Sequence, residues 1–353
     1  MLIFPAFLFP QKEETVKNKQ IVGLIVAALA FVFVCSSSVL LKRWISGNES
    51  NDGNGFFSYL NEVAETGNQF DFPQDRFIAV VRVEGTIAPS QTTSMFESQQ
   101  GYDHNFTMNY IEQLMGAENN AGILLYVDSP GGTVYEADEL YLKLMEYKEK
   151  TSRPVVAYFG SEACSGGYYV SMAADKIYAN RNNWTGSIGV IISMVNYKDL
   201  FDKWGIKEIN ITSGENKAMG SGGIEFTKEQ EAILKGLVDE AYDQFVGIVA
   251  QGRNLNEEKV RELADGRIYS AKQACENQLI DQIGTYEDSL DALREMTGSG
   301  YTQCYEPDLE SNWLTDLFGA YQAGITKSDA QVLTEELEKR GKGGLMYYAE
   351  TGR

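Results

Sequence analysis

The sequence predicts an α/β domain with a mostly parallel sheet and flanking helices, preceded by one N-terminal transmembrane helix. Between residues 77 and 252, short β-branched runs alternate with stretches of helical periodicity, as in right-handed βαβ units. The run 122–128 (GILLYVD) is almost continuously apolar, which is typical of a strand buried on both faces. Residues 21–41 carry no charge and have the length of a helix that crosses a bilayer.

The charge-free segment 21–41 predicts a retained membrane anchor. A cleaved signal peptide usually has an apolar region of only about 7–15 residues and a small-residue cleavage site, and no such site follows here. A lipoprotein site at Cys35 is disfavoured because Val34 stands where a small residue is expected. Both flanks of the segment are basic, so charge does not orient it. The start MLIFPAFLFP is read either as a second membrane contact or as a misassigned start codon.

The chain divides into five predicted parts. They are an N-terminal tail (1–20), the anchor (21–41), a linker (42–75), the α/β domain (76–296) and a C-terminal extension (297–353). The linker is predicted from its Gly, Asn, Asp and Ser content, which favours a flexible tether.

Within the domain, each element follows from its pattern. Apolar, β-branched runs predict strands at 77–87, 122–128, 154–160, 176–179, 187–194 and 206–212. Apolar residues at helical spacing predict helices at 108–119, 134–150, 166–174 and 228–252. This order places the turns that follow the strands at one edge of the sheet, where α/β proteins hold their ligands.

Composition excludes several classes of function. The net charge of −20 disfavours nucleic-acid binding, and no nucleic-acid partner is expected. The four cysteines are scattered without CxxC spacing, and there is one histidine, so neither a disulfide framework nor a zinc site is predicted. We predict no cofactor and no metal. A hydrophobic content of 43% is sufficient for a sizeable core.

Three glycine-containing turns lie beside predicted strands. They are Asp128–Gly132 (DSPGG), Ser165–Gly167 (SGG) and Thr185–Ser187 (TGS). The first two follow strands of a parallel sheet and are therefore expected to lie close together. Glycine allows positive φ and close approach of a ligand to the backbone. The N–H groups of Gly132 and Gly166 are therefore candidate donors to an oxyanion.

Two nucleophiles stand side by side in the stretch EACSGGYYV. Ser165 lies at a strand-to-helix turn, where the helix dipole favours developing negative charge, although a serine there can also serve only as a helix cap. Cys164 is expected to be buried and inert, because a catalytic cysteine needs a nearby histidine. The one histidine, His104, lies in a polar stretch and is expected in a surface loop.

Without histidine, a serine nucleophile needs another base, and lysine is the known substitute. A lysine acts as a base only when neutral, so its pKa must fall from about 10.4 to about 7–8 through burial away from carboxylates. Lys217 lies among small residues in SGENKAMGSGG, although a solvated loop lysine is also possible. The other candidates lie on predicted polar helix faces or beside a short helix: Lys198, Lys203, Lys228, Lys235 and Lys259.

Four motifs occur in a familiar order: SPGG at 129–132, SGGYY at 165–169, TGSIGV at 185–190 and SGENKAMG at 213–220. Together with the anchor they resemble the signal peptide peptidase A family in its short single-copy form. SPGG alone would be weak, since Clp-type proteases and crotonase-fold enzymes share similar turns. Cys164 departs from the family pattern, which usually has alanine there.

The resemblance implies a crotonase/Clp-like fold with Ser165 as nucleophile, Lys217 as general base and Ser187 orienting the lysine amine. Gly132 and Gly166 would supply the oxyanion hole. It also implies a dome-shaped homo-oligomer whose subunits can complete one another's sites. The protein would be a single-pass protein of the bacterial cytoplasmic membrane, with its catalytic domain outside the cytoplasm. Its substrates would be signal peptides released from preproteins.

Two other functions remain open from the sequence: a crotonase-like acyl-CoA hydratase or isomerase, and a non-catalytic membrane scaffold of the same fold. The tail run 345–349 (LMYYA) is apolar and ends in a small residue, as a signal peptide does. We therefore expect either that this tail enters the active-site groove as substrate or plug, or that it is a disordered terminus.

Overall fold

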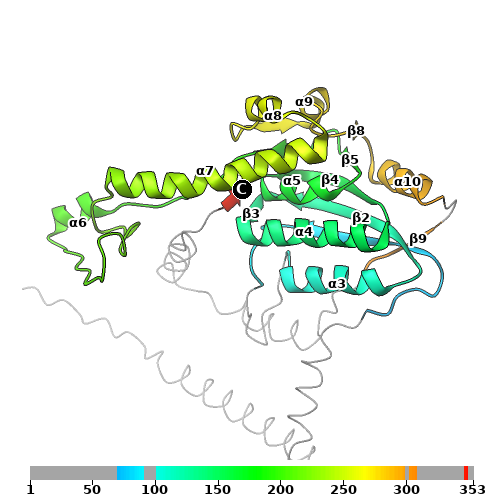
Figure 1. The fold of residues 1–353 in the computed structure, drawn as a ribbon, viewed down its shortest axis with the longest axis horizontal. Coiled ribbons are helices and arrows are strands. Elements are labelled where there is room, and N and C mark those ends of the chain that lie inside the picture. Colours follow the sequence, from blue (N-terminus) through cyan, green and yellow to red (C-terminus); the bar gives the residue numbers. More distant parts are fainter. Residues whose placement is uncertain (1–69, 91–100, 299–301, 308–345, 349–353) are drawn as a thin grey trace, which may run out of the picture. The chain divides into compact units, whose positions relative to one another are not determined.

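The computed structural model describes residues 70–90, 101–298 and 302–307, and the backbone of 346–348 (Figure 1). The predicted anchor at 21–41 and most of the predicted linker lie outside these residues. None of the described helices is long and apolar enough to span a bilayer.

The predicted parallel sheet is confirmed. Its main path runs in the order β7 (Ile268–Ser270), β6 (Trp184–Gly186), β4 (Val155–Cys164), β2 (Asn120–Ser129), β1 (Phe77–Glu84) and β9 (Gln303–Tyr305). Off this path, β5 (Lys176–Ala179) pairs with β4 and with β8 (Gln282–Ile283). Neighbouring strands are parallel except for β6 and β7, which are antiparallel.

Helices connect and cover these strands. They are α3 (His104–Gly116), α4 (Val134–Thr151), α5 (Gly166–Val170), α6 (Lys198–Trp204), α7 (Lys228–Arg253), α8 (Glu257–Leu263), α9 (Ala271–Glu276) and α10 (Tyr286–Met296). A short 3₁₀ turn, Ser171–Ala173, continues α5. The short strand β3 (Gly131–Thr133) lies between β2 and α4.

The core lies on both faces of the sheet. Alternate residues of β1 point to opposite faces, so Phe77 and Ala79 join the larger cluster and Ile78 joins the smaller one. The larger cluster includes buried side chains of α3, α4 and α5, while the smaller cluster lies under Leu290 and Leu293 of α10. Full burial of each large apolar side chain contributes about 1.5–3 kcal/mol, which fixes the strands that lead to the glycine turns.

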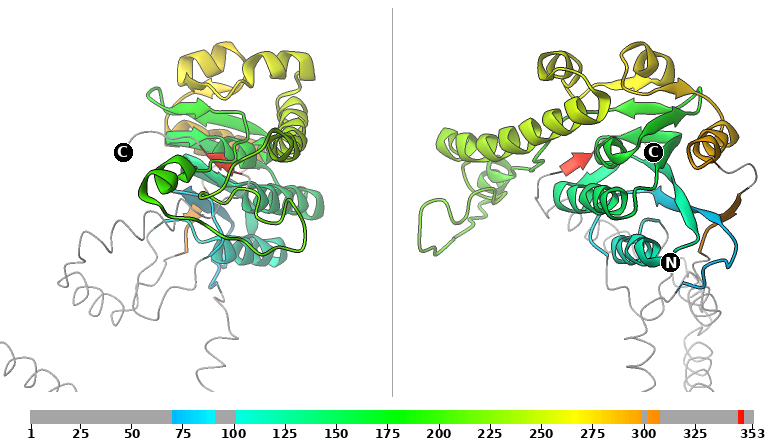
Figure 2. Two further views of the ribbon diagram at one scale, coloured as in Figure 1. Left: turned by 90° about the vertical axis from the view of Figure 1, so that its left-hand side faces the viewer. Right: turned by 45° about the vertical axis from the view of Figure 1, so that its right-hand side comes forward.

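Helix α7 packs on this core with only one of its halves. A capping box between Thr227 and Gln230 starts it, and its buried apolar residues, from Ala241 to Val249, all lie in the second half. The first half therefore projects away from the sheet, with α6 near its far end (Figures 1 and 2). We call residues 191–226, which run out to α6 and back to α7, the arm.

Two predicted strands, 187–194 and 206–212, are wrong. The strand near the first is β6, which ends at Gly186, and neither segment belongs to a strand of the sheet. The β-branched residues of 206–212 have no neighbouring strand to pack on, and Ile209 and Ile211 are 81% and 98% exposed, whereas Ile188 of the first segment is buried in the core without belonging to a strand. β propensity reflects a fit to a half-buried pleated surface, which the arm does not provide within one chain.

Candidate active site

Ser165 lies at a strained turn between β4 and α5. Its φ of 52° and ψ of −115° are unusual for a residue other than glycine, and its surface is only 1% exposed. Its N–H donates to the Gly186 carbonyl (2.8 Å), and its carbonyl accepts from the Tyr169 N–H (2.8 Å). The side chain makes no capping hydrogen bond to α5. The backbone is therefore fixed from both sides while the hydroxyl does not act as a helix cap.

The two glycine turns meet, as the parallel topology predicts. A Cβ placed on Gly166 would lie 3.1 Å from the Gly132 nitrogen and 3.2 Å from the Gly131 Cα. Gly166 is the first residue of α5, so its N–H has no acceptor within the helix. Both predicted oxyanion donors are thus beside Ser165.

The direction of the Gly132 N–H follows from its neighbours. The Ile87 N–H donates to the Gly131 carbonyl (2.8 Å), and the Thr133 N–H donates to the Ile87 carbonyl (2.9 Å). The Gly131 carbonyl and the Gly132 N–H belong to one planar trans peptide and point in opposite directions. The Gly132 N–H therefore points away from Ile87, toward the other edge of β3.

Ser187 also lies close to Ser165. It directly follows Gly186, whose carbonyl binds the Ser165 N–H, and its own N–H donates to the Arg267 carbonyl (2.8 Å). The residue is buried and has a φ of 48°. Its predicted role in orienting a lysine amine stays a prediction.

Lys217 does not reach this cluster within one chain. It lies on the arm in a turn where its N–H donates to the Gly214 carbonyl (3.1 Å), and its side chain is exposed. Among the described residues, its ammonium has no hydrogen bond or ion pair. The apolar pocket that a lysine base requires is therefore not formed around Lys217 by one chain.

Three of the disfavoured lysines have carboxylate partners. Lys198 pairs with Asp202 (2.7 Å), Lys259 with Glu262 (2.9 Å), and Lys235 with Asp239. A carboxylate partner stabilises the ammonium form, so these pairs agree with the reasons for setting these residues aside.

Cys164 is buried, as predicted. Its Sγ donates to the Trp184 carbonyl (3.6 Å), and burial together with the nearby Glu162 raises the pKa of the thiol. Since the thiolate is the reactive form of cysteine, the raised pKa supports the prediction that this thiol is inert.

The prediction that His104 lies in a surface loop is wrong. His104 is the first residue of α3 and is buried. Its Nδ1 is 2.7 Å from the Tyr102 hydroxyl, and its Nε2 is 2.8 Å from a carboxylate oxygen of Glu139 on α4. The polar stretch forms a helix start because the Asp103 side chain caps it by accepting from the Phe106 N–H. The ring joins α3 to α4, and neither of these two contacts involves Ser165.

A segment from the C-terminal extension lies at the site. The strand β10 (Met346–Tyr348) pairs antiparallel with β3, with Tyr347 opposite Gly132 (Figure 1). This is the edge of β3 to which the Gly132 N–H points. The tail run at 345–349, selected from its sequence alone, therefore contains the segment that lies along the predicted oxyanion strand.

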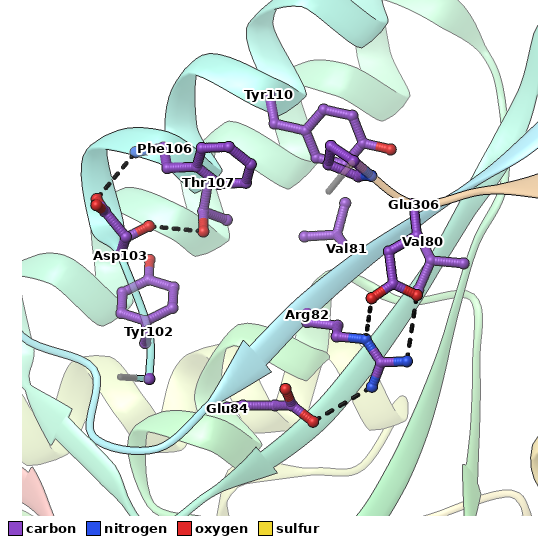
Figure 3. Close-up of a pocket in the computed structure, with 12 residues that line it drawn as sticks. Val80, Val81, Arg82, Glu84, Tyr102, Asp103, Phe106, Thr107, Tyr110 and Glu306 are labelled. Carbon is purple, nitrogen blue, oxygen red and sulfur yellow. Dashed lines mark hydrogen bonds and ion pairs between the residues drawn. The ribbon is translucent and has the colours of Figure 1, made fainter. Parts of the chain in front are cut away.

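A pocket at the edge of β1 contains none of the predicted site residues (Figure 3). Phe106 and Tyr110 of α3 form part of its wall. The Arg82 guanidinium binds the Glu306 carboxylate through two nitrogens and lies 3.2 Å from Glu84. The hydrogen bond to Glu306 raises the pKa of Arg82 further, and the pocket is lined by this one cation and by three carboxylates, those of Glu84, Asp103 and Glu306.

Sequence comparison finds relatives for most of the chain. Residues 147–299 match the model of peptidase family S49, a range that contains Ser165, Ser187 and Lys217. A protein of Enterococcus faecium described as a signal peptide peptidase SppA is 36% identical over 82% of this chain and 84% of its own length. Protease 4 of Haemophilus influenzae is 29% identical over 74% of this chain, but the aligned part is 41% of that relative.

Among solved structures, a ClpP1 mutant from Listeria monocytogenes overlies 60% of this chain and 94% of its own. The TM-score is 0.37 and the sequence identity 14%. The mostly parallel α/β architecture is therefore established by the strands themselves, and its assignment to the crotonase/Clp-like folds stays a prediction.

Proposed function

This chain belongs to peptidase family S49, and from that premise we propose that it is a membrane-anchored endopeptidase in which Ser165 and Lys217 degrade released signal peptides. The family makes the protein a serine protease. The observation that carries the finer proposal is the strand β10, because it lies along β3 at the buried turn of Ser165. That edge accepts an extended peptide.

Strand addition supports a peptide substrate. Backbone hydrogen bonds to an exposed strand edge hold an extended peptide in a fixed direction, independent of most of its side chains. The pairing of Tyr347 with Gly132 shows that the edge has room for a backbone beside the Gly132 N–H. A substrate held in the same way would present a carbonyl to that donor.

The proposed reaction is acyl transfer through Ser165. Lys217 takes the proton of the Ser165 hydroxyl as Oγ attacks the substrate carbonyl, and the N–H groups of Gly132 and Gly166 stabilise the oxyanion. Collapse of this intermediate breaks the C–N bond, and the protonated lysine gives its proton to the leaving amine. Water activated by the same lysine then hydrolyses the acyl-enzyme. Ser187 would orient the lysine amine.

We propose that a second copy of the chain supplies the desolvated pocket that Lys217 needs to act as a base. Lys217 is exposed in one chain, whereas a lysine base must be desolvated. The arm that carries it also exposes Trp204 and Ile211, at 71% and 98%. Burial of these side chains against a neighbouring subunit would bring Lys217 of one copy to Ser165 of another. We therefore propose a homo-oligomer with shared sites.

The membrane location rests on the segment 21–41, which has the length and composition of a spanning helix. The relative from Enterococcus faecium is described as a signal peptide peptidase, and signal peptides are released within membranes. An anchored protease with a strand-binding edge would meet such substrates directly. We propose a single-pass protein of the bacterial cytoplasmic membrane with its catalytic domain outside the cytoplasm.

Turnover of a fluorogenic signal-peptide-like peptide by the full chain in detergent tests the proposal. We expect Ser165→Ala and Lys217→Ala to abolish cleavage, while the control Lys235→Ala, which alters an exposed lysine of α7, retains it. Full activity of either dyad variant would exclude the Ser–Lys pair. Activity on an acyl-CoA in place of the peptide would favour a crotonase-like enzyme, and activity on neither would favour a scaffold.

The tail is proposed to act as an internal substrate or plug of this site. Its support is the pairing of β10 with β3, since a strand in that place competes with other peptides. Intact-mass measurement of the wild type and of Ser165→Ala separates the two roles. Trimming that depends on Ser165 indicates a substrate. Equal, untrimmed tails in both proteins contradict self-cleavage and leave only a plug, which deletion of 345–353 would convert into faster peptide turnover.

A further inference from the structure

Ser129 makes two hydrogen bonds beneath the oxyanion turn. It is the last residue of β2 and is fully buried. Its hydroxyl donates to the Gly85 carbonyl (2.6 Å) and accepts from the Gly131 N–H (3.1 Å). One side chain thereby ties the end of β1 to the residue that precedes the oxyanion donor Gly132.

Gly131 needs such a tie because its own backbone is permissive. Its φ is 102°, a region in which glycine moves more freely than any other residue. Two bonds restrain it: the Ser129 hydroxyl holds its N–H, and the Ile87 N–H holds its carbonyl (2.8 Å). Since the Gly131 carbonyl and the Gly132 N–H share one planar peptide, a rotation of Gly131 would redirect the Gly132 N–H.

Helix α5 packs closely against Ser129. A Cβ on Gly167 would lie 2.9 Å from the Ser129 carbonyl oxygen, so the helix that starts after Ser165 lies directly on Ser129. The nucleophile and the oxyanion donor are thus both placed with respect to the same buried serine.

We propose that Ser129 is a positioning residue of the peptidase site, whose hydroxyl sets the direction of the Gly132 N–H through Gly131. The predicted effect on kinetics rests on the proposed function. The predicted restraint of Gly131 rests on the hydrogen bonds alone. Ser129 does not touch the substrate. It acts on the stabilisation of the oxyanion, which develops only in the transition state, and so it affects kcat more than KM.

The kinetic test compares Ser129→Ala with Ser289→Ala in the full chain. Ser289 is a matched control, since it is fully buried and its hydroxyl donates to one carbonyl, that of Tyr286, on α10. Removal of a direct oxyanion donor lowers kcat by about 10²–10³-fold. We expect Ser129→Ala, which only misdirects that donor, to lower kcat about 10–100-fold with KM within twofold. Ser289→Ala should match the wild type.

A peptide aldehyde separates positioning from general damage. It forms a hemiacetal with Ser165 whose oxygen occupies the oxyanion hole, whereas the corresponding peptide acid binds without that bond. Ser129→Ala should lose affinity for the aldehyde by about the same factor as kcat and keep its affinity for the acid. Equal loss for both ligands, or an unchanged affinity for the aldehyde, would overturn the inference.

Two further measurements keep the test decisive. If Ser129→Ala does not fold, Ser129→Cys, which is nearly isosteric and bonds more weakly, should show the same pattern at a smaller size. Amide hydrogen exchange in the inactive Ser165→Ala background needs no peptidase activity, and Ser129→Ala should there accelerate exchange at 131–133. Unchanged exchange would refute the role of Ser129, whereas a wild type that cleaves no peptide would refute the proposed function.

Discussion

The turn that carries Ser165 and the arm that carries Lys217 are built in opposite ways. Ser165 is buried, and two hydrogen bonds fix its backbone in a strained conformation: its N–H donates to the Gly186 carbonyl and its carbonyl accepts from the Tyr169 N–H. Lys217 is exposed, and α6 of the arm has no buried residue at all. The first region is complete in one chain. The second has apolar side chains and a proposed base that stay exposed to solvent in one chain.

This difference indicates which half of the site depends on assembly. Strain at Ser165 persists because the surrounding sheet over-determines it, so the backbone of the proposed nucleophile and of the proposed oxyanion donors is already fixed in one chain. A lysine in water keeps its proton, so the base is not preformed. Substitutions in either region test this difference.

The largest expected effect comes from mixing two inactive proteins. Ser165→Ala and Lys217→Ala should each lose about 10⁴-fold or more in kcat, as when one member of a catalytic unit is removed. If each site pairs Ser165 of one copy with Lys217 of the next, a 1:1 co-assembled mixture should recover about a quarter of wild-type activity, since half the sites have the serine and half of those meet the lysine.

The measurement is peptide turnover after the two proteins are refolded or expressed together. Recovery above the sum of the single variants supports shared sites. A co-assembled mixture without recovery would place both residues of each site in one chain, and the contrast between the two regions would then reflect only a movement of the arm.

A second large effect is expected at the preformed half. A Cβ on Gly132 would lie 1.7 Å from the Ile87 carbonyl oxygen, so Gly132→Ala must displace β3. We expect kcat to fall about 100-fold or more through the misplaced oxyanion donor, and stability to fall by about 1–3 kcal/mol through overpacking. Kinetics and thermal unfolding measure the two. Gly236→Ala on α7, where a Cβ meets no neighbour, is the control, and an active Gly132→Ala would exclude this donor.

A moderate effect is expected from a charge on the arm. Ile211→Glu changes a side chain that is 98% exposed in one chain, so the stability of the single chain should change by no more than about 0.5 kcal/mol. If the arm is an interface, the charge should lower the assembly state in sedimentation and reduce peptide turnover about tenfold at low protein concentration. Leu142→Glu, an exposed leucine of α4, should do neither. Unchanged sedimentation of Ile211→Glu would contradict the interface.

A small effect is expected next to the nucleophile. Cys164 is buried with a raised pKa, so its thiol stays protonated at neutral pH. Cys164→Ala should keep peptide turnover within about twofold, since it removes one sulfur atom from a core that does not use it. Brief treatment of the native wild type with iodoacetamide should also leave activity intact. Inactivation that Cys164→Ala prevents would show that this region is more open than the hydrogen bonds indicate.

The smallest effect concerns α4, which follows β3. Hydrogen bonds from Lys150 and Lys143 lower the pKa of Glu146 to about 2. A carboxyl whose folded pKa lies below its unfolded value stabilises the fold above the unfolded pKa, and that contribution disappears as the pH falls toward 2. Glu146→Gln should therefore be slightly less stable than the wild type at pH 7, by about 0.5 kcal/mol or less at this exposed site. Denaturant unfolding at pH 7 and pH 2 measures the difference, and a larger gap at pH 2 would contradict this sign.

Much of the fold could be predicted from the sequence because its signals are local. The strand 122–128 and the helix 134–150 were correct to within a few residues, since continuous apolar runs and helical periodicity reflect burial in this same chain. The long helix at 228–252 was correct for the same reason, although half of it projects from the core.

The errors arise where the burial of a residue depends on segments that are distant in the sequence or on a partner outside the single chain. Residues 187–194 and 206–212 have the β-branched composition of strands but belong to no strand of the sheet, so the composition alone misled. His104 was misplaced because the Glu139 carboxylate that binds its ring lies on α4, a segment distant in sequence. The order of the parallel strands correctly predicted that the turns of Gly132 and Gly166 meet, whereas Ser187 was selected only through the family resemblance. Lys217 was selected by elimination, and its approach to Ser165 stays a prediction. Ser129 was missed as a positioning residue, although SPGG contains it.

The exposure of Lys217 also has a consequence for when the chain becomes active as a protease. Under the proposed assembly, a newly synthesised chain has a nucleophile but no base, and it is a latent zymogen that needs no propeptide. Activity would then rise more steeply than the number of chains in the membrane, because each site requires an encounter. Crowding within the bilayer would act as the trigger, and dilution of the chains would switch proteolysis off without any inhibitor.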